Sequence, residues 1–307
     1  MWSGMKELTE VSKEKIEELN KAQKEARTAD FIGKAAGAAS LILTFAYIIF
    51  LYWGHILDTT NLAVRIGIAI GLLVLILVTT YYLPVFLKTA RKYRTYSILY
   101  KNTYLKPILE ASFQKGEYQD YAKISLKDMM DFALFKKSRS AQANDCVTGT
   151  YKGIDFSRYD LALKYGKGNA ESDCVLIACE LHTGIKGDVQ VIQNSFKIGG
   201  ESYEQPDNHQ KYLSGSESFD KKFDVYATEE KEAEKLLSSK LMKNFEKLFA
   251  KGTIAAFIDG KHAYLVISRK KDVMEAPLYS PMDPKRCEKE ASIEVDIIRN
   301  WIELLKN

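Results

Sequence analysis

The sequence lacks the short motifs that mark the common enzyme classes. It contains no Walker A loop, no GxGxxG, no HExxH, no GxSxG and no CxxC. The four histidines, His55, His182, His209 and His262, are scattered along the chain. The sequence therefore predicts no catalytic residue, no metal ligand and no cofactor. A catalytic pair of carboxylates far apart in the sequence stays open as an alternative.

Cysteine is scarce, and its spacing excludes a disulfide framework. Cys146, Cys174, Cys179 and Cys287 show no paired spacing, which is typical of free thiols in a reducing compartment. Cys174 and Cys179 are five residues apart on a predicted strand, so they are expected on opposite faces of that strand. This spacing argues against a local pair of metal ligands.

Charged residues are absent from two long stretches, residues 35–57 and 66–87. A helix needs roughly 20 apolar residues to cross the hydrocarbon core of a bilayer. Because the connection at residues 58–65 is short, we interpret the two stretches as an antiparallel transmembrane hairpin. A cleavable signal peptide would have a shorter apolar core. A hairpin buried in a soluble protein would have to hide both stretches in succession.

Basic residues are unevenly placed around this hairpin. The connection holds one, Arg65, whereas residues 88–106 hold six Lys or Arg and no acid. The positive-inside rule then places both termini in the cytoplasm and the connection outside the cell membrane. We expect four of these side chains to contact lipid headgroups, although the orientation signal alone also explains them. The four are Lys88, Arg91, Lys92 and Arg94.

Small residues recur at a spacing of four in both stretches, at Gly33 and Gly37 and at Gly67 and Gly71. Such rows allow helix backbones to approach closely. In an antiparallel hairpin the two rows lie at opposite depths, so they cannot face each other. Two interpretations follow: each row packs against bulky side chains of the hairpin, or it contacts another copy in a homo-oligomer.

The chain divides into four predicted parts: an amphipathic helix at 1–30, the hairpin at 31–87, a basic juxtamembrane helix at 88–111 and a soluble domain at 112–307. Residues 112–144 are predicted as loop and short helix, with Ser125 as an N-cap, and 194–218 as a long loop. Alternating apolar patterns and turn residues predict an α+β domain with a mainly antiparallel sheet. The expected strands are 146–151, 154–165, 174–181, 188–193, 223–227, 253–258 and 262–268. The expected helices are 228–251, with a break at Ser238-Ser239, and 288–305.

Four segments carry a resemblance to a known family: YKGIDF at 151–156, FDVYAT at 223–228, LLSSKLM at 236–242 and YLVI at 264–267. With the membrane hairpin before them, they resemble the bacterial membrane proteins that contain domain of unknown function 3137. The family usually has Ser where this chain has Ala227, and often Thr-Pro where it has Ser238-Ser239. The resemblance covers most of residues 30–270 and implies a membrane hairpin followed by a cytoplasmic domain. The family has no established activity, so it implies no catalytic residue.

These observations favour a membrane-anchored, cytoplasm-facing module that binds or scaffolds an unidentified protein or lipid partner. The soluble domain is slightly acidic, with 30 basic and 32 acidic residues after position 106, so no nucleic-acid partner is expected. The alternative is a membrane-tethered enzyme with a dispersed active site. A transporter subunit is less favoured, because neither apolar stretch contains a charged residue.

Overall fold

The computed structural model describes residues 11–56, 61–122, 138–165, 170–180, 184–198, 201–203, 205–249, 252–269 and 274–306. The chain forms two compact units. The helical unit comprises Glu10–Thr103 and Ala276–Met282, and the sheet unit comprises Tyr104–Glu275 and Asp283–Asn307. The helical unit is therefore discontinuous in the sequence, which the sequence analysis did not predict.

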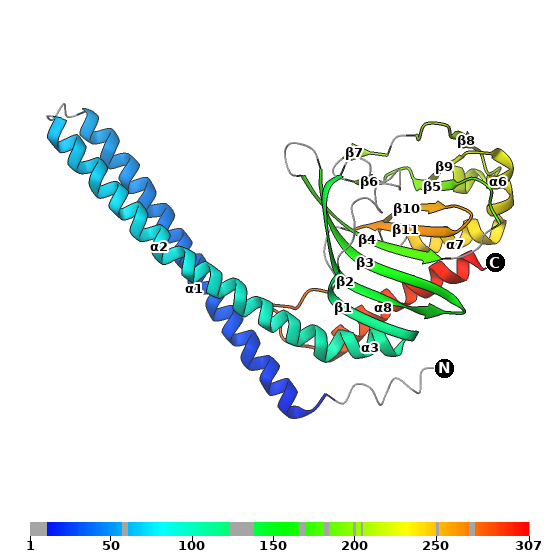
Figure 1. The fold of residues 1–307 in the computed structure, drawn as a ribbon, viewed down its shortest axis with the longest axis horizontal. Helices are drawn as coiled ribbons and strands as arrows, with labels where there is room; N and C mark the ends of the chain where they lie inside the picture. Colours follow the sequence, from blue (N-terminus) through cyan, green and yellow to red (C-terminus); the bar gives the residue numbers. More distant parts are fainter. Residues whose placement is uncertain are drawn as a thin grey trace. The chain divides into compact units, whose positions relative to one another are not determined.

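Two long antiparallel helices build the helical unit, α1 (Lys13–Ile56) and α2 (Asn61–Tyr100) (Figure 1). Ser12 begins α1, because its hydroxyl accepts a hydrogen bond from the backbone N–H of Lys15 at 3.3 Å. The predicted amphipathic helix and the first apolar stretch are thus parts of one continuous helix, and residues 1–10 lie outside the described chain.

Within the described residues, one helical segment, Lys13–Ala46, is long and apolar enough to cross a membrane. Only 6% of its most apolar window is buried, so packing inside the protein does not account for its hydrophobicity. The second apolar stretch lies in α2, where most side chains between residues 72 and 84 are outside the described part. Its role as a second membrane span stays a prediction.

The predicted continuation of α2 toward residue 111 is confirmed, with a change in helix type. A π-helical turn, η2 (Lys101–Leu105), follows α2 and leads into α3 (Lys106–Ala111). Pro107 lies in the first turn of α3. Since proline has no N–H and its ring clashes with the carbonyl four residues earlier, the regular α-helical hydrogen bonds stop here. The π-helical turn η2 keeps the chain helical across this interruption.

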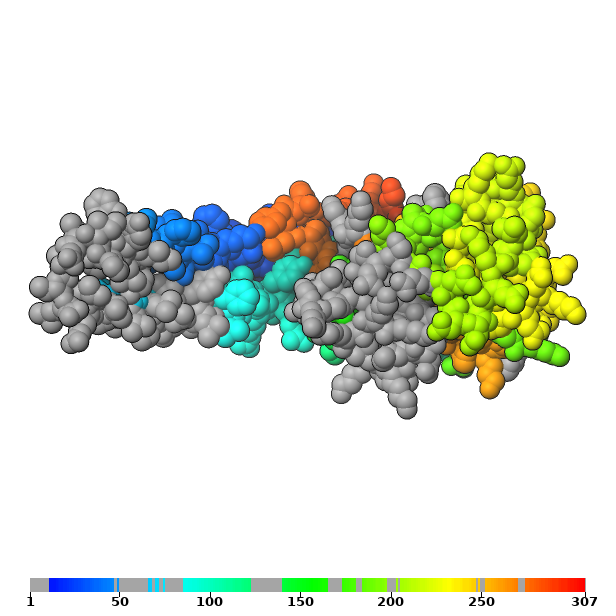
Figure 2. Space-filling model, turned by 90° about the horizontal axis from the view of Figure 1, so that it is seen from above, coloured from blue at the N-terminus to red at the C-terminus, as the bar shows by residue number. Residues whose placement is uncertain are grey.

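A segment from the C-terminal half of the chain completes the helical unit. This segment, Ala276–Met282, is called the strap below. Gln23 Nε2 donates to the carbonyl oxygens of Pro277 and Ser280 at 2.6 and 3.0 Å. Tyr96 OH donates to the same Pro277 oxygen at 2.8 Å. The strap (orange) therefore lies against α1 (blue), as Figure 2 shows.

The sheet unit contains a nine-stranded sheet in which every neighbouring pair is antiparallel. The strand order is β1-β2-β3-β4-β11-β10-β5-β9-β8. The predicted α+β class with a mainly antiparallel sheet is confirmed. The strands are β1 (Gln114–Ala122), β2 (Ser138–Tyr151), β3 (Ile154–Tyr165), β4 (Ala170–Glu180), β5 (Val189–Gln193), β8 (Gln210–Tyr212), β9 (Phe223–Ala227), β10 (Thr253–Ile258) and β11 (His262–Ser268). A separate two-stranded sheet pairs β6 (Lys197–Ile198) with β7 (Glu201–Ser202).

Helices cover one face of the large sheet (Figure 1). They are α3, α7 (Ser239–Phe249) and α8 (Pro284–Leu305), with the short α5 (Glu217–Asp220) and α6 (Glu230–Leu236) near β9. Trp301 of α8 and Phe245 of α7 are fully buried, with ring centroids 6.1 Å apart. The opposite face has its own apolar cluster, which includes Leu161, Cys174 and Leu176. Cys179 instead approaches Trp301, so the predicted opposite orientation of Cys174 and Cys179 is confirmed.

The structure corrects several predicted elements. Residues 114–122 form β1 rather than loop, and β2 begins at Ser138 rather than near residue 146. The predicted long loop at 194–218 contains β6, β7 and β8. The final helix begins at Pro284, because Asp283 accepts a hydrogen bond from the N–H of Lys285 at 3.0 Å and proline suits the first helical turn. The helix expected after Ser125 lies outside the described residues.

Candidate functional site

A cleft of about 650 Å³ lies between α1 and α2 in the helical unit. This cleft falls within the 300–1,000 Å³ range of small-molecule sites. Its apolar wall consists of Ala29, Ile32 and Val85. Its polar lining comes in equal parts from the two helices: Lys24, Glu25 and Thr28 from α1, and Lys88, Thr89 and Lys92 from α2.

The positions of these residues follow from helical periodicity. Lys24, Thr28 and Ile32 are spaced by four and lie on one side of α1. Val85, Lys88 and Lys92 share a side of α2 in the same way. Because the helices are antiparallel, the basic ends of both rows meet at one end of the cleft and the apolar ends meet at the other. The cleft thus has a cationic end and an apolar end.

One of the three lysines in the cleft already has a carboxylate partner. Lys92 Nζ lies 2.5 Å from Glu25 Oε2, and this hydrogen bond and the charge of Lys92 lower the pKa of Glu25. Lys24 and Lys88 are exposed, and the described part of the chain gives neither of them an ion pair. The cleft therefore carries a net positive charge, with two ammonium groups available to an anion.

The two threonine hydroxyls of the cleft are occupied by the backbone. Thr28 Oγ1 donates to the carbonyl oxygen of Lys24 at 2.9 Å. Thr89 Oγ1 is within hydrogen-bond distance of the carbonyl oxygens of Ala29 and Val85, at 2.9 and 3.0 Å. Their protons are thus already used, and the lysine ammonium groups are the side-chain donors that the cleft offers to an anion.

The predicted headgroup residues divide between the cleft and the open surface of α2. Lys88 and Lys92 line the cleft, whereas Arg91 and Arg94 are exposed on α2 and do not line it. Sequence reasoning missed Lys24, which comes from the other helix. The available signal was the antiparallel pairing itself, which brings residues near 24 opposite residues near 92.

The predicted small-residue row of α1 lies at the contact between the two helices. Gly33 is buried, and a Cβ atom at this position would lie 3.1 Å from Thr89 Oγ1. Gly37 is half-buried, and Gly67 and Gly71 are buried. Gly33 thus permits α1 to approach a polar side chain of α2 in the same chain.

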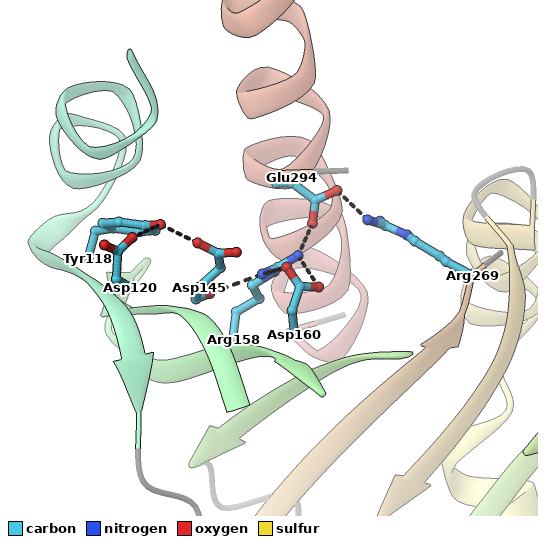
Figure 3. A network of polar contacts seen from close by, with 7 residues as sticks. All are labelled: Tyr118, Asp120, Asp145, Arg158, Asp160, Arg269 and Glu294. Atoms are coloured by element: carbon cyan, nitrogen blue, oxygen red, sulfur yellow. Dashed lines mark hydrogen bonds and ion pairs between the residues drawn. The ribbon is translucent and has the colours of Figure 1, made fainter. Parts of the chain in front are cut away.

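A second candidate is a network of buried charges in the sheet unit (Figure 3). Arg158 and Asp160 are two residues apart on β3, so both point toward α8. The Arg158 guanidinium donates to both Asp160 oxygens, at 2.7 and 2.8 Å, and to Glu294 of α8 at 2.8 Å. Arg269, directly after β11, donates to the other Glu294 oxygen at 2.7 Å. The Arg158 side chain is 0% exposed and that of Glu294 is 2% exposed.

A tyrosine and two aspartates extend this network toward β1. Tyr118 OH donates to Asp145, and it lies 3.0 Å from Asp120 Oδ1. Asp145 has a φ of 47° at an irregularity in the pairing of β2 with β3, and its carbonyl oxygen accepts from Arg158 at 3.0 Å. Burial together with the charge of Asp145 raises the pKa of Tyr118 far above its ordinary value. Tyr118 therefore acts as a neutral hydrogen-bond donor.

The electrostatics of the network indicate structural ion pairs. Burial alone would raise the pKa of Glu294, but the guanidinium groups of Arg158 and Arg269 lower it on balance. The neighbouring cavity, lined in part by Asp160, Cys174 and Arg269, measures about 40 Å³. That volume holds a water molecule but no substrate. Burial also raises the pKa of Cys174, so this thiol does not supply a thiolate at neutral pH.

Among the residues that the structure describes, the other histidines and the cysteines form no catalytic grouping, and His182 lies outside them. All four cysteines are buried and free. His209 Nε2 lies 2.7 Å from Asp188 Oδ1, and His262 stacks on Tyr264. Within the described ranges, no cluster of three or more His, Cys, Asp or Glu residues is arranged to hold a metal ion.

The comparisons with known proteins support the family resemblance and little more. Among solved structures, the chain is similar to the mycobacterial trehalose monomycolate transport factor A, TtfA, with 12% identity and a TM-score of 0.37. That alignment covers 62% of this chain and 86% of TtfA, and a likeness of this size carries no argument about function. No curated protein sequence matches the chain. Residues 174–307 match the family described as protein of unknown function (DUF3137), which confirms the predicted resemblance over those residues.

Proposed function

We propose that this protein is a membrane-anchored binding module, in which the helical unit anchors the chain in a bacterial cell membrane. The observation that carries the proposal is the exposure of large apolar side chains on both long helices. On α1, Phe31 is 73% exposed and Phe45 is 66% exposed; on α2, Phe86 is 53% exposed and Leu87 is 58% exposed.

Such exposure is costly in water, where each large apolar side chain left unburied forgoes roughly 1.5–3 kcal/mol. Soluble monomers rarely expose continuous apolar patches of this extent. Hydrocarbon is the solvent in which these side chains are stable. We call the apolar parts of α1 and α2 together the apolar belt, and charged residues lie where it ends. Asp30 and Lys34 form an ion pair of 2.7 Å on α1, and Lys88 follows the apolar stretch on α2.

The bias of basic residues supports an orientation with both termini and the sheet unit in the cytoplasm. A binding role is favoured over catalysis because the cleft between α1 and α2 has the size of a ligand site. The cavity beside the buried ion network does not. We call the cleft the juxtamembrane cleft, since this orientation places it beside the membrane. A protein partner for the sheet unit and a homo-oligomeric state stay predictions.

Two measurements on the full chain test the proposal. After alkaline carbonate treatment of cell membranes, the protein should remain with the lipid fraction. Recovery in the soluble fraction would contradict anchoring. Orientation is read by labelling intact cells with a membrane-impermeant maleimide. The wild-type chain provides a low background, because its four cysteines are buried and burial raises the pKa of Cys146 to about 11.

Three variants, each with one cysteine added to the four buried native ones, report on the two sides of the membrane. Thr60→Cys, between the two apolar stretches, should be labelled in intact cells. Lys13→Cys at the start of α1 and Leu213→Cys, an exposed position in the sheet unit, should be labelled only after permeabilisation. Labelling of Leu213→Cys in intact cells would place the sheet unit outside and overturn the orientation.

A further inference from the structure

We infer that the juxtamembrane cleft is a binding site for the phosphate group of an anionic lipid in the cytoplasmic leaflet. The inference rests on the proposed function and adds a ligand class and a defined site to it. Three observations carry it: the uncompensated charge of the cleft, the order of its polar and apolar walls, and its depth relative to the apolar belt.

The positive charge of the cleft attracts the negative charge of a phosphodiester. Lys92 is balanced by Glu25 at 2.5 Å, whereas Lys24 and Lys88 line the same cleft with no ion pair in the described part of the chain. Two ammonium groups, one from each helix, therefore line one space. Lysine serves as a point charge for phosphate oxygens, so a single anion between α1 and α2 satisfies both helices.

The depth of the cleft fits the headgroup zone. Each leaflet has a polar zone about 5–7 Å thick outside a hydrocarbon core of about 30 Å. Lys88 is three residues from Val85, or about 4.5 Å along the helix axis. With Val85 at the hydrocarbon edge, Lys88 lies among the phosphates. Lys92 and Lys24, which are level with each other because Glu25 pairs with Lys92, lie about 10 Å from that edge, and their long side chains reach back toward the headgroups.

The apolar end of the cleft distinguishes a lipid from a free anion. Ile32 and Val85 form that end, and Phe31 and Phe86 continue it onto the exposed apolar belt. An acyl chain attached to the bound phosphate continues directly along this surface. Inorganic phosphate has no apolar group to contact Ile32 and Val85, so the occupant is a membrane lipid.

The test is native mass spectrometry of the full chain released from nanodiscs that contain a minor fraction of phosphatidylglycerol in phosphatidylcholine. The wild-type protein should retain phosphatidylglycerol. Lys24→Gln/Lys88→Gln should weaken this binding roughly 30-fold, since each basic residue beside anionic lipid contributes about fivefold. Thr28→Phe keeps every charge but fills the cleft, and it should give a comparable loss.

The matched control is Lys13→Gln/Lys15→Gln, which removes the same charge from the exposed start of α1 and should retain the lipid. Equal losses in this control or in Arg91→Gln/Arg94→Gln would indicate diffuse attraction and overturn the site. If millimolar inorganic phosphate displaced the lipid, the ligand would be a free phosphate rather than a lipid, and the inference would be wrong. All cleft variants should still resist carbonate extraction, so failure of the cleft is distinguishable from failure of the anchor.

Discussion

Removing the Glu294 carboxylate should destabilise the sheet unit more than any surface charge change. Glu294 accepts hydrogen bonds from Arg158 at 2.8 Å and from Arg269 at 2.7 Å while it is almost completely buried. Hydrogen bonds to charged groups each contribute roughly 1.5–3 kcal/mol, and breaking a buried ion pair costs about 3–5 kcal/mol. Arg158 keeps Asp160 as a partner, so we expect about 3–4 kcal/mol for Glu294→Gln.

The assay is urea unfolding of the full chain in detergent, followed by near-UV circular dichroism of the buried aromatic residues. With an m-value of about 2–3 kcal/mol/M, the midpoint should fall by roughly 1–2 M. Glu246→Gln is the matched control, because Glu246 pairs with Lys222 at 2.8 Å on the surface and should cost under about 1 kcal/mol. Equal shifts in the two variants would refute the argument that buried charges stabilise this domain.

The same carboxylate predicts an acid-sensitive component of stability. The pKa of Glu294 is lowered in the folded protein from an ordinary value of 4.5. Its contribution is therefore complete above about pH 5 and is lost as the pH falls through the folded pKa. The unfolding free energy of Glu294→Gln should depend less on pH below 4.5 than that of the wild type. An unchanged pH dependence would show that Glu294 does not titrate with folding.

Two further predictions concern the helical unit. Gln23→Ala removes the hydrogen bonds to Pro277 and Ser280. At about 1 kcal/mol per lost bond, chymotrypsin should cleave within the strap about 30-fold faster; an unchanged rate would mean that other contacts hold the strap. Gly33→Leu should displace Thr89, because a Cβ atom at position 33 would lie 3.1 Å from Thr89 Oγ1. The substitution should cost about 1–3 kcal/mol of helix-pair stability. A melting temperature in detergent no lower than that of Gly33→Ala would contradict this.

Local turn chemistry explains why some strands were predicted to the residue. The β10–β11 hairpin was predicted at 253–258 and 262–268, and these are the observed bounds. Asp259 Oδ1 accepts from the N–H groups of Lys261 and His262, both at 2.7 Å. Such an Asx-type turn is encoded by adjacent residues, so one sequence suffices to find it.

Strands that lack an apolar pattern were missed. β1 is an edge strand whose residues are mostly polar, and Tyr118 is its single buried residue. The first half of β2 is similarly polar around Arg139 and Gln142. These segments become strands because β2 and β3 supply pairing partners, and tertiary pairing of this kind leaves little trace in a local window.

Both candidate sites depend on residues far apart in the sequence. Arg158 and Glu294 are separated by 136 positions, and each looks like an ordinary charge in its own segment. Lys88 and Lys92 were predicted from the basic bias of residues 88–106, but Lys24 comes from the opposite helix. The sequence therefore shows which residues are charged, but only the fold shows which of them lie together in a site.

The strap imposes an order on biosynthesis. Gln23 and Tyr96 leave the ribosome early, but their partner Pro277 lies 177 positions after Tyr100, the end of α2. At a translation rate of about 5–20 residues per second, the delay is on the order of 10–35 s. Throughout that interval the newly made helix pair has to persist without its hydrogen bonds to the strap. Its last piece arrives only after Tyr104–Glu275 of the sheet unit has been made.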